Sequence, residues 1–119
     1  MAFKLNHVHL KTPDPQKTAQ FYVDNLGAKV IGEAGGNGVR LDLHGLTLNV
    51  TKFIESQKHE QKYGIEHIAI DTDDMPALVE KLKASGAKIL EETTVGNGRK
   101  VCFFEGPDGV HLEFLEVVD

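Results

Sequence analysis

The segment KLNHVHLKTPD at residues 4–14 is followed, at residues 64–74, by the similar segment GIEHIAIDTDD. The two segments share a histidine, an alternation of apolar residues, a threonine and an aspartate at matching positions. Alternating apolar residues are typical of a strand with one buried face, and repeated segments predict repeated structural units. We therefore expect two equivalent strands, each opening one copy of a repeated module.

Three further landmarks recur in the same order along the chain. They are Gly-Ala-Lys at 27–29 and 86–88, Asn-Gly at 37–38 and 97–98, and the segments HGLTLNV at 44–50 and DGVHLEF at 108–114. Their common order predicts an internal duplication that covers most of the chain.

The sequence after each opening strand predicts a helix and then three strands. Asp14 is a predicted helix N-cap, Pro15 is suited to the first helical position, and Gly27 is a predicted stop. Asp74 and Gly86 take the corresponding places in the second copy. The later apolar runs are separated by Asn-Gly at 37–38 and 97–98 and by His44-Gly45 and Pro107-Asp108-Gly109. These residues can supply the positive φ of tight turns, so they predict antiparallel hairpins.

The predicted fold is therefore α+β, with two tandem βαβββ modules forming cup-shaped mixed sheets. Module one is expected at residues 1–53, a linker without a strand pattern at 54–63, and module two at 64–119. A chain of 119 residues suits one domain built from two such halves.

Composition narrows the class of protein. The formal net charge of -5 argues against nucleic acid and anionic membranes as partners, and a small-molecule substrate is expected instead. No signal sequence or membrane span is recognisable, so the expected location is cytoplasmic. Cys102 is the single cysteine. It can be a buried structural thiol or a nucleophile, and the surrounding apolar run favours the structural role.

Strand parity predicts the functional face. His7 and His67 occupy matching places in the two opening strands, while Asn49 and Glu113 occupy matching places in the last strands, all on the face opposite the helices. Two imidazoles and a carboxylate are typical of a divalent metal site with open positions. The alternative is a set of separate polar residues on a half-solvated sheet.

These residues also carry a resemblance to a known family. With FYVDNLG at 21–27 and FEGPDGVHLE at 104–113, the repeated segments resemble the vicinal-oxygen-chelate superfamily, which includes glyoxalases, extradiol dioxygenases, methylmalonyl-CoA epimerases and bleomycin-resistance proteins. The resemblance implies that His7, His67 and Glu113 are metal ligands. It also implies a glyoxalase/bleomycin resistance/dioxygenase-like fold.

One departure bears on the reaction that the resemblance implies. Glyoxalases of this superfamily carry a glutamate where this chain has Asn49, and an amide is not a general base. Asn49 is still a candidate catalytic residue, because it can bind the metal through its carbonyl oxygen or hold a water molecule. His9 and His111 are alternative proton carriers, or they are wall residues. Lys11 and Arg40 are candidates for binding an anionic substrate end, or they are surface charges.

The sequence thus predicts a metal-dependent lyase, isomerase or thiol transferase that acts on a small molecule. The divalent metal can be zinc, nickel, cobalt, manganese or ferrous iron, because such a donor set accepts all of them. The alternative is a metal-free, bleomycin-resistance-like binding protein. A homodimer is expected in either case, because a small chain leaves much apolar surface uncovered.

Overall fold

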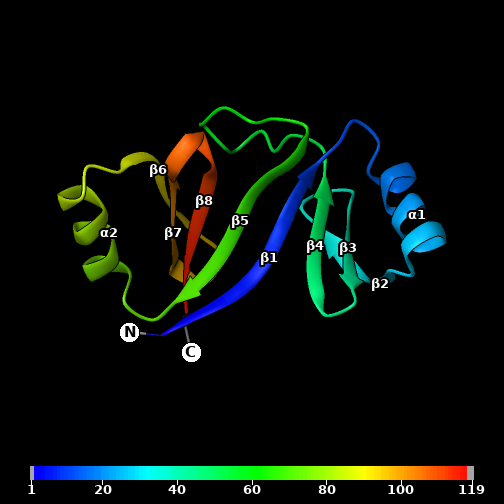
Figure 1. Cartoon of the computed structure of the whole chain (residues 1–119), viewed down its shortest axis with the longest axis horizontal. Coiled ribbons are helices and arrows are strands. Elements are labelled where there is room, and N and C mark those ends of the chain that lie inside the picture. Colours follow the sequence, from blue (N-terminus) through cyan, green and yellow to red (C-terminus); the bar gives the residue numbers. More distant parts are fainter. Residues whose placement is uncertain (1, 118–119) are drawn as a thin grey trace. The chain divides into compact units, whose positions relative to one another are not determined.

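The computed structural model describes residues 2–117, without the side chain of Asn97. Within this part, eight strands and two helices follow the order predicted for a repeated βαβββ module, which confirms the α+β class. Internal contacts divide the chain into two compact units (Figure 1). The N-terminal unit holds residues 7–66, and the C-terminal unit holds residues 67–117 together with residues 2–6.

The first module contains four strands and one helix. They are β1 (Phe3–Lys11), α1 (Pro15–Leu26), β2 (Lys29–Ala34), β3 (Gly38–Leu43) and β4 (Leu46–Thr51). The strand order is β2-β3-β4-β1, with β1 parallel to β4 and the other two pairs antiparallel. Helix α1 lies against β3 and β4 (Figure 1).

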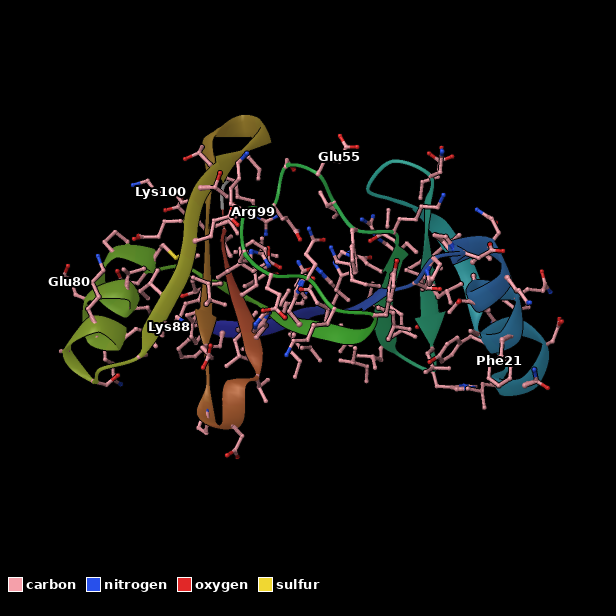
Figure 2. All side chains as sticks on the ribbon, turned by 90° about the horizontal axis from the view of Figure 1, so that it is seen from above. Phe21, Glu55, Glu80, Lys88, Arg99 and Lys100 are labelled. Atoms are coloured by element: carbon pink, nitrogen blue, oxygen red, sulfur yellow. The ribbon has the colours of Figure 1, made fainter. Side chains whose placement is uncertain are left out.

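The second module repeats this arrangement. It contains β5 (Gly64–Thr72), α2 (Met75–Ala84), β6 (Lys88–Val95), β7 (Arg99–Glu105) and β8 (His111–Glu116), with 3-10 turns at Gly96–Gly98 and Pro107–Gly109. The strand order is β5-β8-β7-β6, with β5 parallel to β8. Helix α2 lies against β6 and β8, and Glu80 projects from its outer side (Figure 2).

The helix boundaries follow the predicted signals. Asp14 caps α1 by accepting a hydrogen bond from the Lys17 amide at 3.1 Å, and Pro15 is the first helical residue. Gly27 ends α1 in the left-handed conformation, with φ 71°. Asp74 precedes α2 without such a side-chain bond, and Gly86 follows it with φ 84°. Within the part of the chain that the structure describes, no helix is long and apolar enough to span a membrane.

Strand parity correctly predicts the two helix-facing cores. In the N-terminal unit, Leu10, Leu48 and Val50 pack with Ala19 of α1. In the C-terminal unit, Phe114 packs with helix residues Leu78 and Val79 and with strand residues Cys102 and Phe104. The C-terminal unit has a further apolar cluster, made of Ala69, Val101, Phe103 and Leu115.

One predicted turn is built differently. Asn37-Gly38 was expected to supply the positive φ of the first hairpin, but Gly36 supplies it, with φ 67°. Gly38 is buried at the start of β3, where a Cβ atom would collide with the carbonyl oxygens of Ala34 and Val50. The need for glycine at this position is therefore close packing rather than backbone conformation.

The segment between the modules forms a closed loop over residues 53–63. Phe53 and Tyr63 stack at its two ends, with ring centroids 4.4 Å apart. The side chain of Gln61 accepts from the Ile54 amide at 2.8 Å and donates to the Ile54 carbonyl at 2.9 Å. These contacts hold the loop ends together within the N-terminal unit.

Candidate functional site

His67 and Glu113, two of the predicted metal ligands, lie together in the C-terminal unit. They come from the parallel neighbours β5 and β8. His67 Nε2 is 3.2 Å from Glu113 Oε1, and the two residues are 2% and 7% exposed. The rings of His67 and Phe103 meet in a T-shaped contact, with centroids 5.3 Å apart and planes at 84°. Packing thus fixes the imidazole next to the carboxylate.

This pair has the geometry of two neighbouring metal ligands. Nitrogen and oxygen donors bind divalent transition metals at about 2.1 Å, so donors at adjacent coordination positions lie about 3.0–3.4 Å apart. The observed 3.2 Å falls in this interval. The same distance also suits a hydrogen bond between the imidazole N–H and the carboxylate. The donor set therefore fits a divalent metal without requiring one.

The third predicted ligand, His7, lies on β1 in the N-terminal unit. It is 8% exposed, and its ring contacts that of His9 with centroids 5.8 Å apart. Asn49, the repeat partner of Glu113, is also buried in this unit, on β4. Each unit therefore holds a buried histidine at the predicted place in its opening strand.

The contact of His9 with Thr51 determines which ring nitrogen of His9 carries the proton. His9 Nε2 lies 2.7 Å from the Thr51 hydroxyl, which donates its own proton to the Lys52 carbonyl at 2.7 Å. Since a hydroxyl has one proton to donate, Thr51 accepts from His9. In the neutral ring, Nε2 then carries the proton and Nδ1 carries the lone pair.

Asn49 forms a side-chain bond that the sequence analysis did not predict. Arg40 Nε donates to Asn49 Oδ1 at 3.0 Å, and the two residues face each other across β3 and β4. His9 is the partner of Asn49 on the other side, across β4 and β1. Partners in register share a face of the sheet, so Arg40, Asn49 and His9 form one polar row.

His111, the remaining predicted site residue, is half-buried at the first position of β8. Its register partners are His67 on β5 and Glu105 on β7. It thus lies on the same side of the C-terminal unit as His67.

Lys11 is neither a surface charge nor an exposed binding group. Its ammonium donates to Gln57 Oε1 at 3.0 Å and to Gln61 Oε1 at 2.7 Å, and it lies 3.6 Å from Glu66 Oε2. The side chains of Lys11 and Glu66 are fully buried. The side chain of His59 in the closed loop is 2% exposed, and its Nε2 lies 3.9 Å from Glu66 Oε1. The buried pair Lys11 and Glu66 therefore fastens the loop to β1 and β5, because Lys11 binds two loop glutamines and Glu66 contacts His59.

Two residues of this region were not among the predicted candidates. Parity placed Thr51 on the same face as Asn49, which was a usable signal for its contact with His9. Glu66 is a charged residue in an otherwise apolar strand segment, directly before His67. Its partner Lys11 is distant in sequence, so no local pattern pointed to the pair.

Cys102 has the environment of a structural thiol. It is 1% exposed within the core beneath α2. Burial raises its pKa to about 11, and the nearby Glu92 carboxylate adds to the effect, while Lys83 opposes it. A thiol with such a pKa is protonated at neutral pH and is a poor nucleophile.

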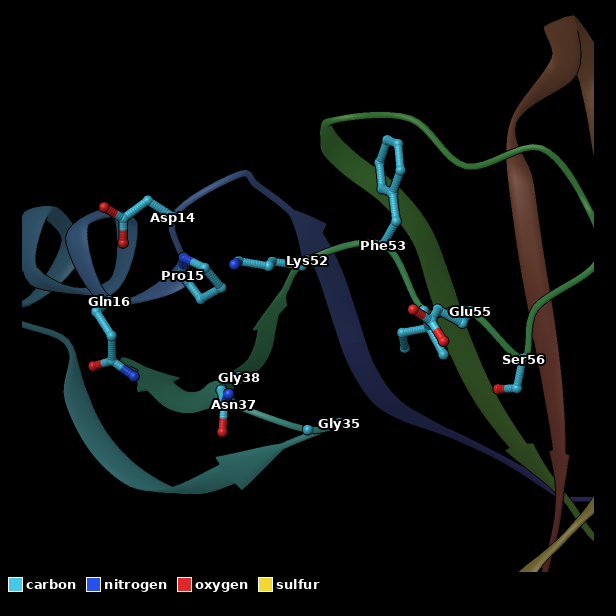
Figure 3. Close-up of a pocket in the computed structure, with 12 residues that line it drawn as sticks. Asp14, Pro15, Gln16, Gly35, Asn37, Gly38, Lys52, Phe53, Glu55 and Ser56 are labelled. Carbon is cyan, nitrogen blue, oxygen red and sulfur yellow. The ribbon is translucent and has the colours of Figure 1, made fainter.

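A groove of about 610 Å³ lies beside the start of α1 in the N-terminal unit (Figure 3). Lys52 extends toward Pro15 along this groove, whose lining also includes the acidic residues Asp14 and Glu55. Its lining contains none of the predicted metal-ligating or catalytic residues. The groove is therefore separate from the polar row.

Comparison with known proteins identifies relatives along nearly the whole chain. The family model described as Glyoxalase/Bleomycin resistance protein/Dioxygenase superfamily matches residues 4–114. The chain is 28% identical to lactoylglutathione lyase of Haemophilus influenzae, over 92% of this chain and 90% of that protein. It is 33% identical to the mitochondrial methylmalonyl-CoA epimerase of Mus musculus, over 92% and 71% respectively.

A solved structure supports the fold independently. Methylmalonyl-CoA epimerase of Streptomyces coelicolor, in complex with 2-nitronate-propionyl-CoA, superposes with a TM-score of 0.71 at 19% identity. The superposition covers 98% of each chain. At this identity the likeness concerns the fold alone.

Proposed function

The chain belongs to the Glyoxalase/Bleomycin resistance protein/Dioxygenase superfamily, and from this membership we propose that it is a metal-dependent enzyme acting on a small molecule. The proposed chemistry is of the lyase, isomerase or thiol-transferase type. The observation that carries the proposal is the buried contact of 3.2 Å between His67 Nε2 and Glu113 Oε1.

We assign His7, His67 and Glu113 as the protein ligands of a divalent metal. The mixed nitrogen and oxygen donors suit zinc, nickel, cobalt, manganese or ferrous iron. When bound, such a metal would chelate two neighbouring substrate oxygens and stabilise the negative charge that develops during the reaction. Phe103 contributes by keeping water from one side of His67 and by fixing its ring plane.

His9 is our first candidate for proton transfer. Its bond to Thr51 holds the ring and leaves Nδ1 as the basic nitrogen, so His9 can accept a proton at that atom. His111, on β8, is the second candidate. Asn49 cannot accept a proton in this way, and its role is to position Arg40 through the bond of 3.0 Å.

The named relatives support this class of chemistry. One is a lactoylglutathione lyase and another a methylmalonyl-CoA epimerase. A protein with a single cysteine also suits the reducing cytoplasm, which remains our proposed location.

Metal analysis tests the proposal directly. Protein purified without chelator should contain, or take up on addition, about one equivalent of a divalent metal per chain. His67→Ala should abolish uptake, and Lys17→Gln on the outer face of α1 is the matched control. Less than about a tenth of an equivalent, with none taken up, would instead favour a metal-free small-molecule binding protein.

We also propose a homodimer whose metal sites draw on both chains, with His7 from one and His67 and Glu113 from the other. Large apolar side chains that remain exposed on strands support burial against a second copy, among them Leu5, Val30 and Ile65.

Light scattering and metal content test this dimer. Co-refolding His7→Ala with His67→Ala in equal amounts should restore about a quarter of the wild-type metal content, because half of the dimers are mixed and each mixed dimer has one intact site of two. Mixed dimers that bind no metal would contradict the shared site. A monomer that binds a full equivalent would contradict the dimer itself.

A further inference from the structure

Arg40 is an exposed cation attached to a buried polar group. Its guanidinium donates through Nε to Oδ1 of Asn49, which is 9% exposed, while the rest of the arginine side chain reaches solvent. This bond uses one N–H of the guanidinium group. The end-on edge, formed by Nη1 and Nη2, remains available for a planar partner.

The surface beside Arg40 is open. On the β2 side its register partner is Gly32, next to an irregularity between Val30 and Gly32. A Cβ atom at Gly32 would meet nothing within 4 Å. The polar row from His9 through Asn49 to Arg40 therefore ends next to space rather than against a side chain.

The charge of Arg40 has no carboxylate partner among residues 2–117. The nearest acid on the same face of its own strand is Asp42, whose Oδ1 accepts from the Gly45 amide at 2.9 Å. An arginine that is fixed in place by a neutral amide and carries no counter-charge is suited to an anionic ligand.

We propose that Arg40 is a specificity-determining residue that binds an oxyanion of the substrate, a carboxylate or a phosphate, through Nη1 and Nη2. Asn49 is its positioning residue. The inference rests on the proposed function, because it assigns the substrate class of that enzyme. Arg40 and His9 flank Asn49 in one row, so the anionic group would bind two strands away from the candidate base.

Asparagine at position 49 is essential to this arrangement. A carboxylate there would form an ion pair with Arg40 and lower its affinity for a substrate anion. The neutral amide orients the guanidinium and leaves its positive charge uncompensated. The same residue that argues against a glutamate-assisted isomerisation thus favours an anionic substrate.

The test uses malonate and inorganic phosphate as probes of the metal-free protein, titrated at constant ionic strength and followed by NMR. Arg40→Gln should weaken binding about tenfold, since it removes a charge-assisted bidentate contact. Arg40→Lys should weaken it about fivefold, because an ammonium keeps the charge but not the planar fork. Asn49→Ala should weaken it about threefold, because Arg40 then loses its orientation.

Lys17→Gln is the control for overall charge, because Lys17 is an exposed cation on α1 of the same unit. It should change binding less than about 1.5-fold. Equal losses in Arg40→Gln and Lys17→Gln, or no loss in Arg40→Gln, would overturn the proposal. Tighter binding of malonate supports a carboxylate substrate, and tighter binding of phosphate supports a phosphorylated one.

Metal content separates this inference from the proposed function. Arg40→Gln should hold the same metal equivalent as wild type, because Arg40 is not a ligand. Wild-type protein that takes up no metal but binds malonate through Arg40 would refute the enzyme proposal and keep the anion site. If wild-type protein takes up metal but Arg40→Gln binds malonate as tightly as wild type, the enzyme proposal stands and the anion site is refuted.

Discussion

The two units use equivalent positions for different chemistry. Lys11 in the repeat corresponds to Asp71, and Glu66 corresponds to Asn6. In the N-terminal unit, Lys11 and Glu66 form a fully buried ion pair at 3.6 Å. In the C-terminal unit, Asn6 donates to Asp71 at 3.0 Å, and the partly exposed Arg99 supplies the opposite charge at 2.9 Å. The duplication thus preserves which positions are in contact, but not the residue types at those positions.

The same contrast extends across the inner strands. The row His9, Asn49 and Arg40 corresponds to Ala69, Glu113 and Phe103. The first row is polar and ends at an exposed arginine, while the second is mostly apolar and surrounds one carboxylate. We infer that the C-terminal unit supplies the buried ligand pair His67 and Glu113, whereas the N-terminal unit supplies the third ligand, His7, and the substrate-binding polar groups.

Truncating the residues at the ends of the two rows, Phe103 and Arg40, should give the largest difference in stability. Phe103→Ala should lower the free energy of unfolding by about 4 kcal/mol, because Phe103 is 2% exposed within an apolar cluster. Arg40→Ala should cost less than about 1 kcal/mol. Urea unfolding followed by circular dichroism measures both. Similar losses would show that the two inner faces are not differently packed.

The next largest difference in stability is expected between the equivalent positions Lys11 and Asp71. Lys11→Met should cost about 3 kcal/mol, because it leaves the Glu66 carboxylate buried without its ammonium partner. Asp71→Asn should cost less than about 1 kcal/mol, since its ion pair with Arg99 is partly solvated. The same unfolding experiment compares them. A Lys11→Met protein as stable as wild type would show that the buried pair is replaceable by apolar packing.

Metal affinity should separate Glu113 from its repeat partner Asn49. Glu113→Gln should weaken metal binding about a hundredfold, near 2.7 kcal/mol, because it removes an anionic ligand. Asn49→Ala should leave affinity within about threefold, because Asn49 is outside the proposed ligand set. Calorimetric titration with zinc or nickel gives both values. Equal weakening would place Asn49 among the ligands.

The smallest effect concerns Cys102, whose counterpart in the first module is Val39. The Cys102 thiol has a pKa raised from 9.0 to about 11, chiefly by burial. Between these pH values the unfolded chain releases the thiol proton while the folded chain retains it, so stability falls as pH rises. The slope cannot exceed about 1.4 kcal/mol per pH unit.

Cys102→Val introduces the residue found at the equivalent position of the first module, and it should remove the pH-dependent loss of stability that the thiol causes. Unfolding curves of both proteins at pH 8, 9.5 and 11 measure it, because the titration of lysines and tyrosines cancels in the difference. A stability difference that stays constant over this range would show that the thiol titrates normally in the folded state.

Local sequence patterns were sufficient to predict much of this molecule. The helix start at Asp14 and the stop at Gly27 depend on nearby residues only, and parity sorted Leu10 and Val50 into the helix-facing core. The contact of Arg40 with Asn49 was also within reach. The short turn at His44-Gly45 pairs Leu43 with Leu46, and counting outward from it brings residue 40 opposite residue 49.

Other features depend on contacts that no local pattern encodes. The burial of Lys11 requires Glu66 and two glutamines of a loop that has no periodicity, so its charge suggested a surface residue. Gly38 was assigned to a turn because Asn-Gly commonly forms one, whereas its role depends on the approach of the Val50 carbonyl from β4. Long-range packing decided both cases.

The assignment of residues 2–6 to the C-terminal unit has a consequence for synthesis on the ribosome. The N-terminal unit is complete once residue 66 has left the exit tunnel, and it can fold while translation continues. The first residues must wait much longer, because Phe3 packs on Phe114 and Asn6 binds Asp71. Residues 3–6 thus reach their final position later than the rest of β1, and a nascent-chain pulse-labelling experiment would find them accessible until Asp71 and Phe114 have emerged.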